Sequence, residues 1–232
     1  MKEIHAMEWN TIADDLNAKG YAVIPGVLSS PECNYLSGLY EDPYLYRSTI
    51  NMQRYRFGKG EYKYFNYPLP LTIQSLRELL YTPLSAIANE WMQTLGTPIG
   101  FPTDHQELVQ QCKDKAQTRP TPLILRYEEG GYNTLHQDLY GEIYFPFQVV
   151  FMLSQAGRDH EGGEFVLIEQ IPRAQSKAEV LQPNQGDAVI FTTNYRPVKG
   201  TRGYYRATMK HGVSEVKSGV RYSLGVIFHD AA

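Results

Sequence analysis

Three side chains of the sequence have the types and the spacing that suit a metal ion. His136 and Asp138 stand one residue apart in "LRYEEGGYNTLHQDLYG", directly after a strand-like run. His211 lies in "RATMKHGVSEV", several strand-like runs further along the chain. Two histidines and one carboxylate on one face form the facial triad that binds non-haem Fe(II) and leaves coordination positions open for a cosubstrate and dioxygen. These residues therefore predict an iron site made of His136, Asp138 and His211.

The spacing of His136 and Asp138 is weak support by itself, since short motifs recur by chance. The triplet His105-Gln106-Glu107 has a similar spacing. No series of strands follows it at the right distance, so it is expected to be a solvated pair. The other histidines stand in a tail, a turn and a strand end without partners, and are expected to be structural or exposed: His5, His160 and His229.

Arg221, in "GVRYSLGVIF", adds a second kind of chemistry. It is expected on the strand that follows His211, and a buried arginine there needs an anion to offset its charge. The guanidinium group matches a carboxylate through two parallel hydrogen bonds. An oxo-acid that chelates iron and carries a distal carboxylate would satisfy both ends, and 2-oxoglutarate is such a molecule. Tyr127, on the strand that leads to His136, is expected to donate its hydroxyl to the same carboxylate.

The elements that must position these residues are strands. After Pro122 the apolar runs have strand length, and turn sequences such as "EEGG", "GRDHEGG" and "KGTRG" separate them. Regular short strands of this kind indicate a barrel or a double sheet. The runs are "LILRY", "FQVVFML", "EFVLIE", "DAVIF", "YYRATM" and "YSLGVIF".

The first half of the chain reads as helices with short strands. The periodicity predicts a helix from Trp9 that stops at Gly20, and a second helix with Ser30 as its N-cap. From Thr72 to Leu95 the apolar residues keep a helical period, and Pro83 is expected to divide this segment into two helices with Thr82 as a cap. "YAVIPGVL" reads as a strand, and residues 97–122 read as a connection with at most one weak helix.

The length of the chain favours one domain, and its net charge does not predict a polyanionic partner. The chain has 232 residues, a formal net charge of −3 and a pI of about 6.1. Cys33 and Cys112 have no metal-type spacing and are expected to be reduced and partly buried. No apolar run approaches the length of a membrane span, and the N-terminus lacks the apolar region of a signal peptide. The expectation is a cytoplasmic protein with no membrane partner.

A family resemblance appears in the same residues. Residues 123–229 resemble the Fe(II)/2-oxoglutarate dioxygenase superfamily, and "LILRYEEGGYNTLHQDLYG" is similar to the corresponding stretch of AlkB-type alkylation-repair enzymes. "HGVSEVKSGVRYSLGVIFHD" and "GRDHEGGEFVLIEQIPRAQSKAEVLQPNQGDAVIF" more closely resemble a bacterial family catalogued as oxygenases acting on damaged DNA. Two positions depart from the alkylation-repair pattern, since Leu125 and Ile227 stand where those enzymes usually have asparagine and arginine.

The resemblance implies a fold, a division of the chain and a set of roles. The fold is expected to be mainly β with a helical N-terminal part (α+β), a double-stranded β-helix or jelly-roll barrel flanked by helices. One dioxygenase domain is expected over 1–232, with a helical, lid-like part in 1–122 and a catalytic barrel in 123–232. The iron ligands are His136, Asp138 and His211, Arg221 anchors 2-oxoglutarate, and Tyr127 is a helper.

Two stretches bear on the substrate. Pro43–Pro68 contains eight aromatic and five basic residues against one glutamate, and Arg196–Lys210 is basic without an acid. Aromatic faces that stack bases, beside cations that contact phosphates, are typical of single-strand binding. Single-stranded or damaged nucleic acid, a peptide and a small molecule all remain open as substrates. A cupin-like barrel with non-oxidative chemistry is the alternative of another class, which Arg221 disfavours.

Overall fold

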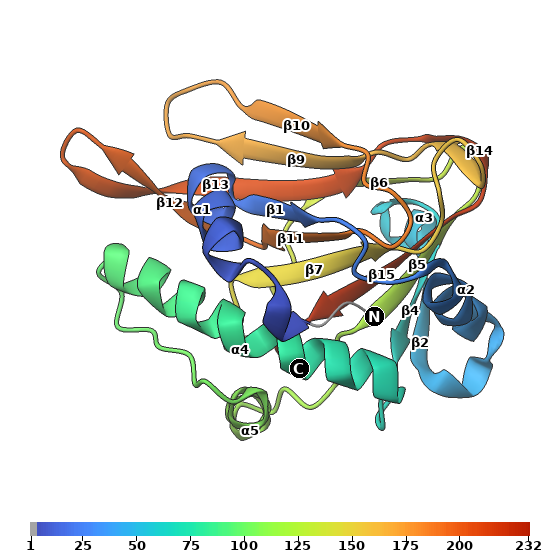
Figure 1. Cartoon of the computed structure of the whole chain (residues 1–232), viewed down its shortest axis with the longest axis horizontal. Helices are drawn as coiled ribbons and strands as arrows, with labels where there is room; N and C mark the ends of the chain where they lie inside the picture. The colour runs from blue at the N-terminus through green and yellow to red at the C-terminus, as the bar shows by residue number, and fades with distance from the viewer. Residues whose placement is uncertain (1–3) are drawn as a thin grey trace.

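Two antiparallel sheets face each other in the computed structural model, which describes residues 4–232 (Figure 1). The larger sheet contains, in spatial order, β1 (Tyr21–Ile24), β11 (Ala188–Thr192), β7 (Phe147–Met152), β15 (Arg221–Ile227), β5 (Leu123–Tyr127), β4 (Glu61–Phe65) and β2 (Tyr46–Asn51). The smaller contains β10 (Lys177–Leu181), β9 (Phe165–Gln170), β13 (Gly203–Val213), β6 (Tyr132–His136) and β3 (Gly58–Lys59), and β12 (Tyr195–Gly200) pairs with β13. β8 (His160–Gly162) and β14 (Val216–Gly219) form a separate pair.

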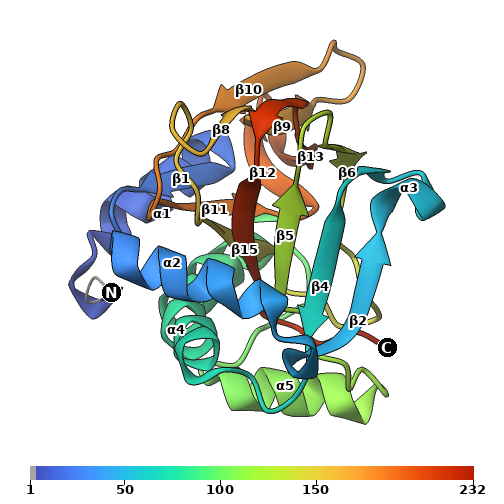
Figure 2. The same ribbon diagram turned by 90° about the vertical axis from the view of Figure 1, so that its right-hand side faces the viewer.

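Most helices gather on the outer side of the larger sheet, away from the smaller sheet (Figure 1). The helices are α1 (Trp9–Lys19), α2 (Ser30–Gly38), the short α3 (Met52–Tyr55), α4 (Leu71–Thr94) and α5 (His105–Asp114), with 3-10 turns η1 (Ile4–Ala6), η2 (Leu39–Glu41) and η3 (Pro43–Leu45). The exceptions are α3, which projects from the end of the β2–β4 hairpin (Figure 2), and α1, which contacts β12 as well as β1 and β11. The prediction of a mainly β fold with helical flanks is confirmed.

The core between α4 and the larger sheet is built from the apolar side of that helix. Trp91 packs edge-on against Phe147 of β7, with ring centroids 4.6 Å apart. Both residues are buried, as are the helix positions that share this face: Ile73, Leu76, Leu80, Leu84 and Ile87. A second cluster of Val150, Phe165, Leu167, Phe191 and Met209 fills the space between the two sheets. These two layers fix the relative position of the strands that carry the candidate site.

The helix boundaries follow local rules, with two corrections. Gly20 ends α1 in the left-handed conformation (φ 79°), as predicted, and its N–H bonds Leu16 O. The N-cap of α2 is Ser29 and not Ser30, since the backbone N–H of Ser29 donates to the carboxylate of Glu32 at 2.8 Å. The prediction that Pro83 divides its segment is wrong, because α4 runs unbroken through it. Leu80 and Leu84 are buried on either side of the proline, so packing outweighs the hydrogen bond that it removes.

His105 also differs from expectation. It is the first residue of α5, and its ring Nε2 donates to Phe228 O at 2.8 Å inside the core. Its ring lies 5.2 Å from that of Tyr81. Burial lowers the pKa of His105 to about 3, so the ring is neutral. The expected solvated pair with Glu107 is therefore wrong, because the amphipathic α5 turns this histidine inward.

The segment Pro43–Pro68 is not a separate layer. β4 pairs with β5, and β2 pairs with β4, so this hairpin continues the larger sheet. Past β2, the chain forms α3 and then β3, which pairs with β6 of the smaller sheet. The hairpin thus joins both sheets at one end of the barrel.

Within residues 4–232, no helix is long and apolar enough to cross a membrane.

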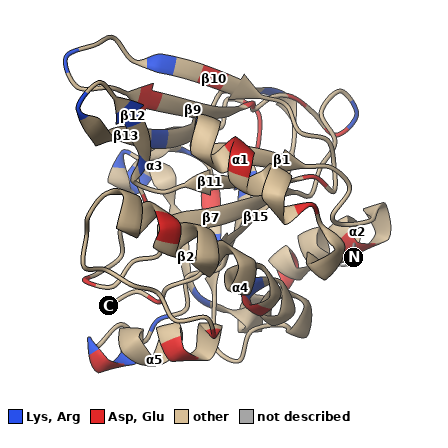
Figure 3. Ribbon diagram, turned by 60° about the vertical axis from the view of Figure 1, so that its left-hand side comes forward, with Lys and Arg blue, Asp and Glu red and all other residues tan. Residues whose placement is uncertain are grey.

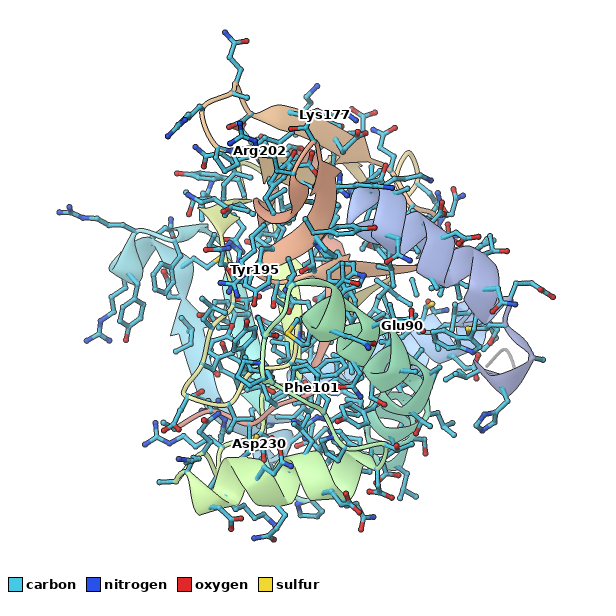
Figure 4. The ribbon with its side chains drawn as sticks, turned by 90° about the vertical axis from the view of Figure 1, so that its left-hand side faces the viewer. Glu90, Phe101, Lys177, Tyr195, Arg202 and Asp230 are labelled. Carbon is cyan, nitrogen blue, oxygen red and sulfur yellow. The ribbon has the colours of Figure 1, made fainter. Side chains whose placement is uncertain are left out.

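A buried ion pair joins α4 to the end of the chain. Arg77 Nη2 lies 2.6 Å from Asp230 Oδ1, and both side chains are fully buried. The guanidinium group also donates to the carbonyl groups of Ile227 and Phe228, while the Tyr67 hydroxyl donates to Asp230. Asp230 lies beside α5 in Figure 4. The pair therefore ties a helix to the tail that follows β15.

Arg77→Met is expected to lower the free energy of unfolding by about 3–5 kcal/mol, because it leaves the Asp230 carboxylate buried without its partner. Urea unfolding followed by circular dichroism measures this loss. Lys19→Met, which removes an exposed pair with Asp15, is the matched control and should cost less than about 1 kcal/mol. Equal losses in the two variants would show that burial of the pair has no energetic consequence.

Candidate functional site

The two predicted histidine ligands are neighbours because of strand register. In the antiparallel pairing of β13 with β6, His211 lies directly opposite His136. Side chains opposite each other in this way share a face of the sheet and touch, and the two rings have centroids 4.2 Å apart. His211 is also packed against Phe191, with ring centroids 4.7 Å apart. Sequence spacing alone does not fix this pairing.

Asp138 completes the cluster just beyond the end of β6. Its Oδ2 lies 3.2 Å from His211 Nε2 and its Oδ1 lies 3.5 Å from His136 Nε2. The candidate ligand atoms of the three residues all lie within 4.8 Å of one another. Within residues 4–232, no other group of three or more histidines, cysteines or carboxylates has its ligand atoms this close together. The structure thus brings together the three residues singled out for metal binding.

The protonation of this cluster suits a cation. His136 Nδ1 donates to Thr134 O at 2.7 Å, and its Nε2 faces Asp138. Fixing the second ring nitrogen in this way orients a histidine as a metal ligand. Burial and the neighbouring His136 lower the pKa of His211. Burial alone would raise the pKa of Asp138, but its hydrogen bond with His211 and the two histidine charges hold it below its usual range.

Register also pairs the two predicted cosubstrate residues, this time in the larger sheet. Arg221 of β15 lies directly opposite Tyr127 of β5. Arg221 is only 2% exposed, and its guanidinium group bonds Ser223 Oγ at 3.1 Å and Met152 Sδ at 3.4 Å, both uncharged. The Tyr127 hydroxyl is buried and, in the described part of the chain, has no hydrogen-bond partner. Burial lowers the pKa of Arg221 and raises that of Tyr127.

One cavity of about 250 Å³ lies between the sheets and connects these two pairs. Its lining includes the histidine–aspartate cluster, Arg221 and Tyr127, so all five predicted site residues open onto the same space. The cavity thus contains a buried arginine without an acidic partner and a cluster of side chains that can ligate a metal. A molecule that chelates a metal at one end and carries a carboxylate at the other would fit both. The donor set and the buried arginine therefore fit Fe(II) and 2-oxoglutarate.

Several further residues of the cavity escaped the sequence interpretation. Ser223 follows Arg221 by two positions on β15, so strand alternation could have found it. Tyr140 lies two residues after Asp138 in the irregular segment beyond β6, where no such alternation applies. Gln148 of β7 and the tyrosines of β4 come from strands whose register is not visible in the sequence. The additional lining residues that matter below are Phe57, Tyr64, Tyr140, Gln148 and Ser223.

The two facing antiparallel sheets with a cavity between them form a double-stranded β-helix. A TM-score of 0.59 relates the chain to a 2OG-Fe(II) oxygenase family oxidoreductase from Burkholderia pseudomallei, with 17% identity over 98% of this chain and 94% of that one. A Pseudomonas putida prolyl-4-hydroxylase gives a TM-score of 0.55, with 13% identity over 96% and 100% of the two chains. These likenesses confirm the predicted jelly-roll fold.

Residues 60–231 match the family Oxygenase-NA, described as "Oxygenase, catalysing oxidative methylation of damaged DNA", and the chain belongs to this family. It is also 45% identical over 168 residues to uncharacterised proteins of two Mycobacterium tuberculosis strains, covering 72% of this chain and 72% of each relative. The prediction of a non-haem iron oxygenase that uses 2-oxoglutarate and dioxygen is confirmed by the family and the fold. The cluster of His136, Asp138 and His211 has the donor atoms that such an oxygenase needs for its metal.

Proposed function

We propose that this protein is an Fe(II)- and 2-oxoglutarate-dependent dioxygenase that oxidises alkylated bases in DNA. His136, Asp138 and His211 hold the iron, and Arg221 with Tyr127 binds the distal carboxylate of 2-oxoglutarate. The observation that carries this proposal is Arg221, a guanidinium group buried in the cavity beside the ligand cluster with only uncharged hydrogen-bond partners. A cupin-like barrel with non-oxidative chemistry would have no use for a cation placed in this way.

The side chains divide the work between binding and orientation. When bound, iron and 2-oxoglutarate supply the oxidation of a C–H bond by dioxygen, with the oxo-acid converted to succinate and carbon dioxide. Arg221 and Tyr127 would hold the distal carboxylate of the oxo-acid, and the two histidines with Asp138 would hold the metal in the same cavity. Ser223 orients the guanidinium group. The apolar lining, which includes Phe165 and Phe191, keeps water from the reacting atoms.

Support for a DNA substrate comes from the family and from α3. Tyr55 and Phe57 stack on each other, with ring centroids 5.6 Å apart and planes 20° apart, and are 49% and 46% exposed. Phe57 also lines the cavity. Arg54 and Arg56 flank Tyr55 and form no ion pair with an acid of the described residues, and Figure 3 shows the basic colouring around α3. Exposed aromatic faces beside cations without an acidic partner suit the binding of single-stranded DNA or of a base flipped out of a duplex.

The position of Phe57 at the cavity supports a lid-like role for this part of the N-terminal half. We propose that residues 1–122 and 123–232 act as one domain, since β4 pairs with β5 and β3 pairs with β6. In this arrangement α3 stands at the rim of the cavity, where a base leaving its stack would enter. A base whose alkyl group carries the oxidised C–H bond would lose that group as an aldehyde after hydroxylation.

Binding of single-stranded oligonucleotides should fall steeply as salt rises, because phosphate contacts release counterions. Replacing Arg54 and Arg56 together by alanine should shrink the salt slope by about one unit per lost contact. Tyr55→Ala should instead cost about 1–3 kcal/mol with the slope nearly unchanged. Fluorescence anisotropy of an anaerobic sample loaded with Fe(II) and 2-oxoglutarate measures both quantities.

Lys113→Ala is the matched control, since this exposed lysine belongs to α5, at the opposite end of the molecule from α3 (Figure 2). Its slope should equal that of the parent. If the parent binds no oligonucleotide at low salt, the DNA substrate is wrong, and a peptide or small molecule becomes the substrate of the same iron site. Succinate formation with an alkylated oligonucleotide, compared with its unmodified counterpart, then tests the reaction itself.

A further inference from the structure

Both carboxylate oxygens of Asp138 carry a hydrogen-bond donor from outside the ligand cluster. The Tyr140 hydroxyl donates to Oδ1 at 2.7 Å, and the side-chain amide of Gln148 donates to Oδ2 at 2.9 Å. The Gln148 nitrogen also lies 3.4 Å from His211 Nε2, so one amide contacts two residues of the cluster. Rotation of the Asp138 carboxylate about its Cβ–Cγ bond would therefore break the hydrogen bonds with Tyr140 and Gln148.

The direction of the hydrogen bonds beyond Tyr140 follows from the number of protons. An ionised carboxylate only accepts, so Tyr140 must spend its single hydroxyl proton on Asp138. The 3.1 Å contact between the hydroxyl groups of Tyr64 and Tyr140 must then be a donation from Tyr64. Tyr64 belongs to β4, is buried, and has Arg47 stacked on its ring at 4.4 Å. A chain Tyr64–Tyr140–Asp138 therefore leads from the N-terminal hairpin to the candidate metal site.

We propose that Tyr140 and Gln148 are positioning residues that hold the Asp138 carboxylate in its metal-binding orientation, and that Tyr64 orients Tyr140. This inference rests on the proposed function. Hydrogen-bond partners of a ligand fix its geometry and tune its donor strength, and their loss weakens metal binding by about 10–100-fold. The β2–β4 hairpin carries α3 at its tip. The hydroxyl groups of Tyr64 and Tyr140 connect this hairpin to the proposed iron site.

The experiment is a titration of the full chain with Co(II) alone, followed through its d–d absorption. Tyr140→Phe should raise the dissociation constant by about 10–100-fold and shift the d–d bands. Gln148→Met, similar in volume but without a donor, should weaken binding in the same direction. Tyr64→Phe should lie between the parent and Tyr140→Phe, because Tyr140 keeps its bond to Asp138. Tyr144→Phe, which removes a hydroxyl contact with Tyr195 outside the cavity, should bind like the parent.

The double variant Tyr64→Phe/Tyr140→Phe separates a chain from two independent effects. If Tyr64 acts only through Tyr140, the double variant should bind Co(II) as Tyr140→Phe does. Parent-like affinity and an unchanged d–d spectrum in both Tyr140→Phe and Gln148→Met would overturn the inference. Should one of these variants fail to fold, as judged by circular dichroism, the other together with Tyr64→Phe decides. A parent chain that binds no Co(II) would instead refute the proposed function.

Discussion

Fe(II) binding is expected to disappear when either His136 or Asp138 is replaced by alanine. Each substitution leaves two ligands of three, and the chelate that holds the cation is lost. Asp138→Ala also removes the negative charge that offsets the metal. Iron per chain, measured after anaerobic incubation with Fe(II) and removal of free metal, should fall from stoichiometric to near zero in both variants.

The folded state of these variants should be retained, since the side chains of His136 and Asp138 line the cavity, are partly exposed and do not belong to the apolar core. Circular dichroism checks this point. His5→Ala, a change at an exposed histidine near the N-terminus, serves as the matched control and should bind iron like the parent. Unchanged iron stoichiometry in Asp138→Ala would show that the metal, if bound, has other ligands.

Arg221→Leu is expected to raise the dissociation constant of 2-oxoglutarate by about 30-fold or more, with Fe(II) binding nearly intact. The lost charge-assisted pair strands the distal carboxylate in the cavity, at about 2–5 kcal/mol. Arg221→Lys keeps the charge without the planar fork and should give an intermediate value. Titration of the anaerobic Fe(II) complex with 2-oxoglutarate, followed by its charge-transfer absorption, gives each constant.

A stability measurement distinguishes an anchor from a structural arginine. In the absence of 2-oxoglutarate, Arg221→Leu should unfold at the same temperature as the parent or higher, because it removes a buried charge that lacks an acidic partner. Added 2-oxoglutarate should raise the unfolding temperature of the parent and not that of the variant. Arg126→Leu, on β5 beside Tyr127 and pointing to the opposite face, is the matched control. Equal 2-oxoglutarate affinity in Arg221→Leu and the parent would mean that another residue binds the carboxylate.

The helices show where local patterns suffice and where packing overrides them. Gly20 ends α1 as predicted, since a left-handed turn after a helix depends on the residue itself. Pro83 was expected to end a helix for the same kind of local reason, yet α4 continues through it. Leu80 and Leu84, on either side of Pro83, belong to a core that α4 shares with distant segments of the chain, so the stabilising effect of their packing cannot be calculated from the helix sequence alone.

The sequence by itself determined the residue types of the site and the strands that carry them. The chemistry of two histidines, a carboxylate and a buried arginine depends on side-chain type, and strand length and turn sequences are local. Only the tertiary structure decided the pairings His136–His211 and Arg221–Tyr127, because register is set by contacts between strands far apart in the chain. It likewise turned His105 into the core and brought Tyr64 and Gln148 to the cavity, since each of these positions depends on which distant segment packs against it.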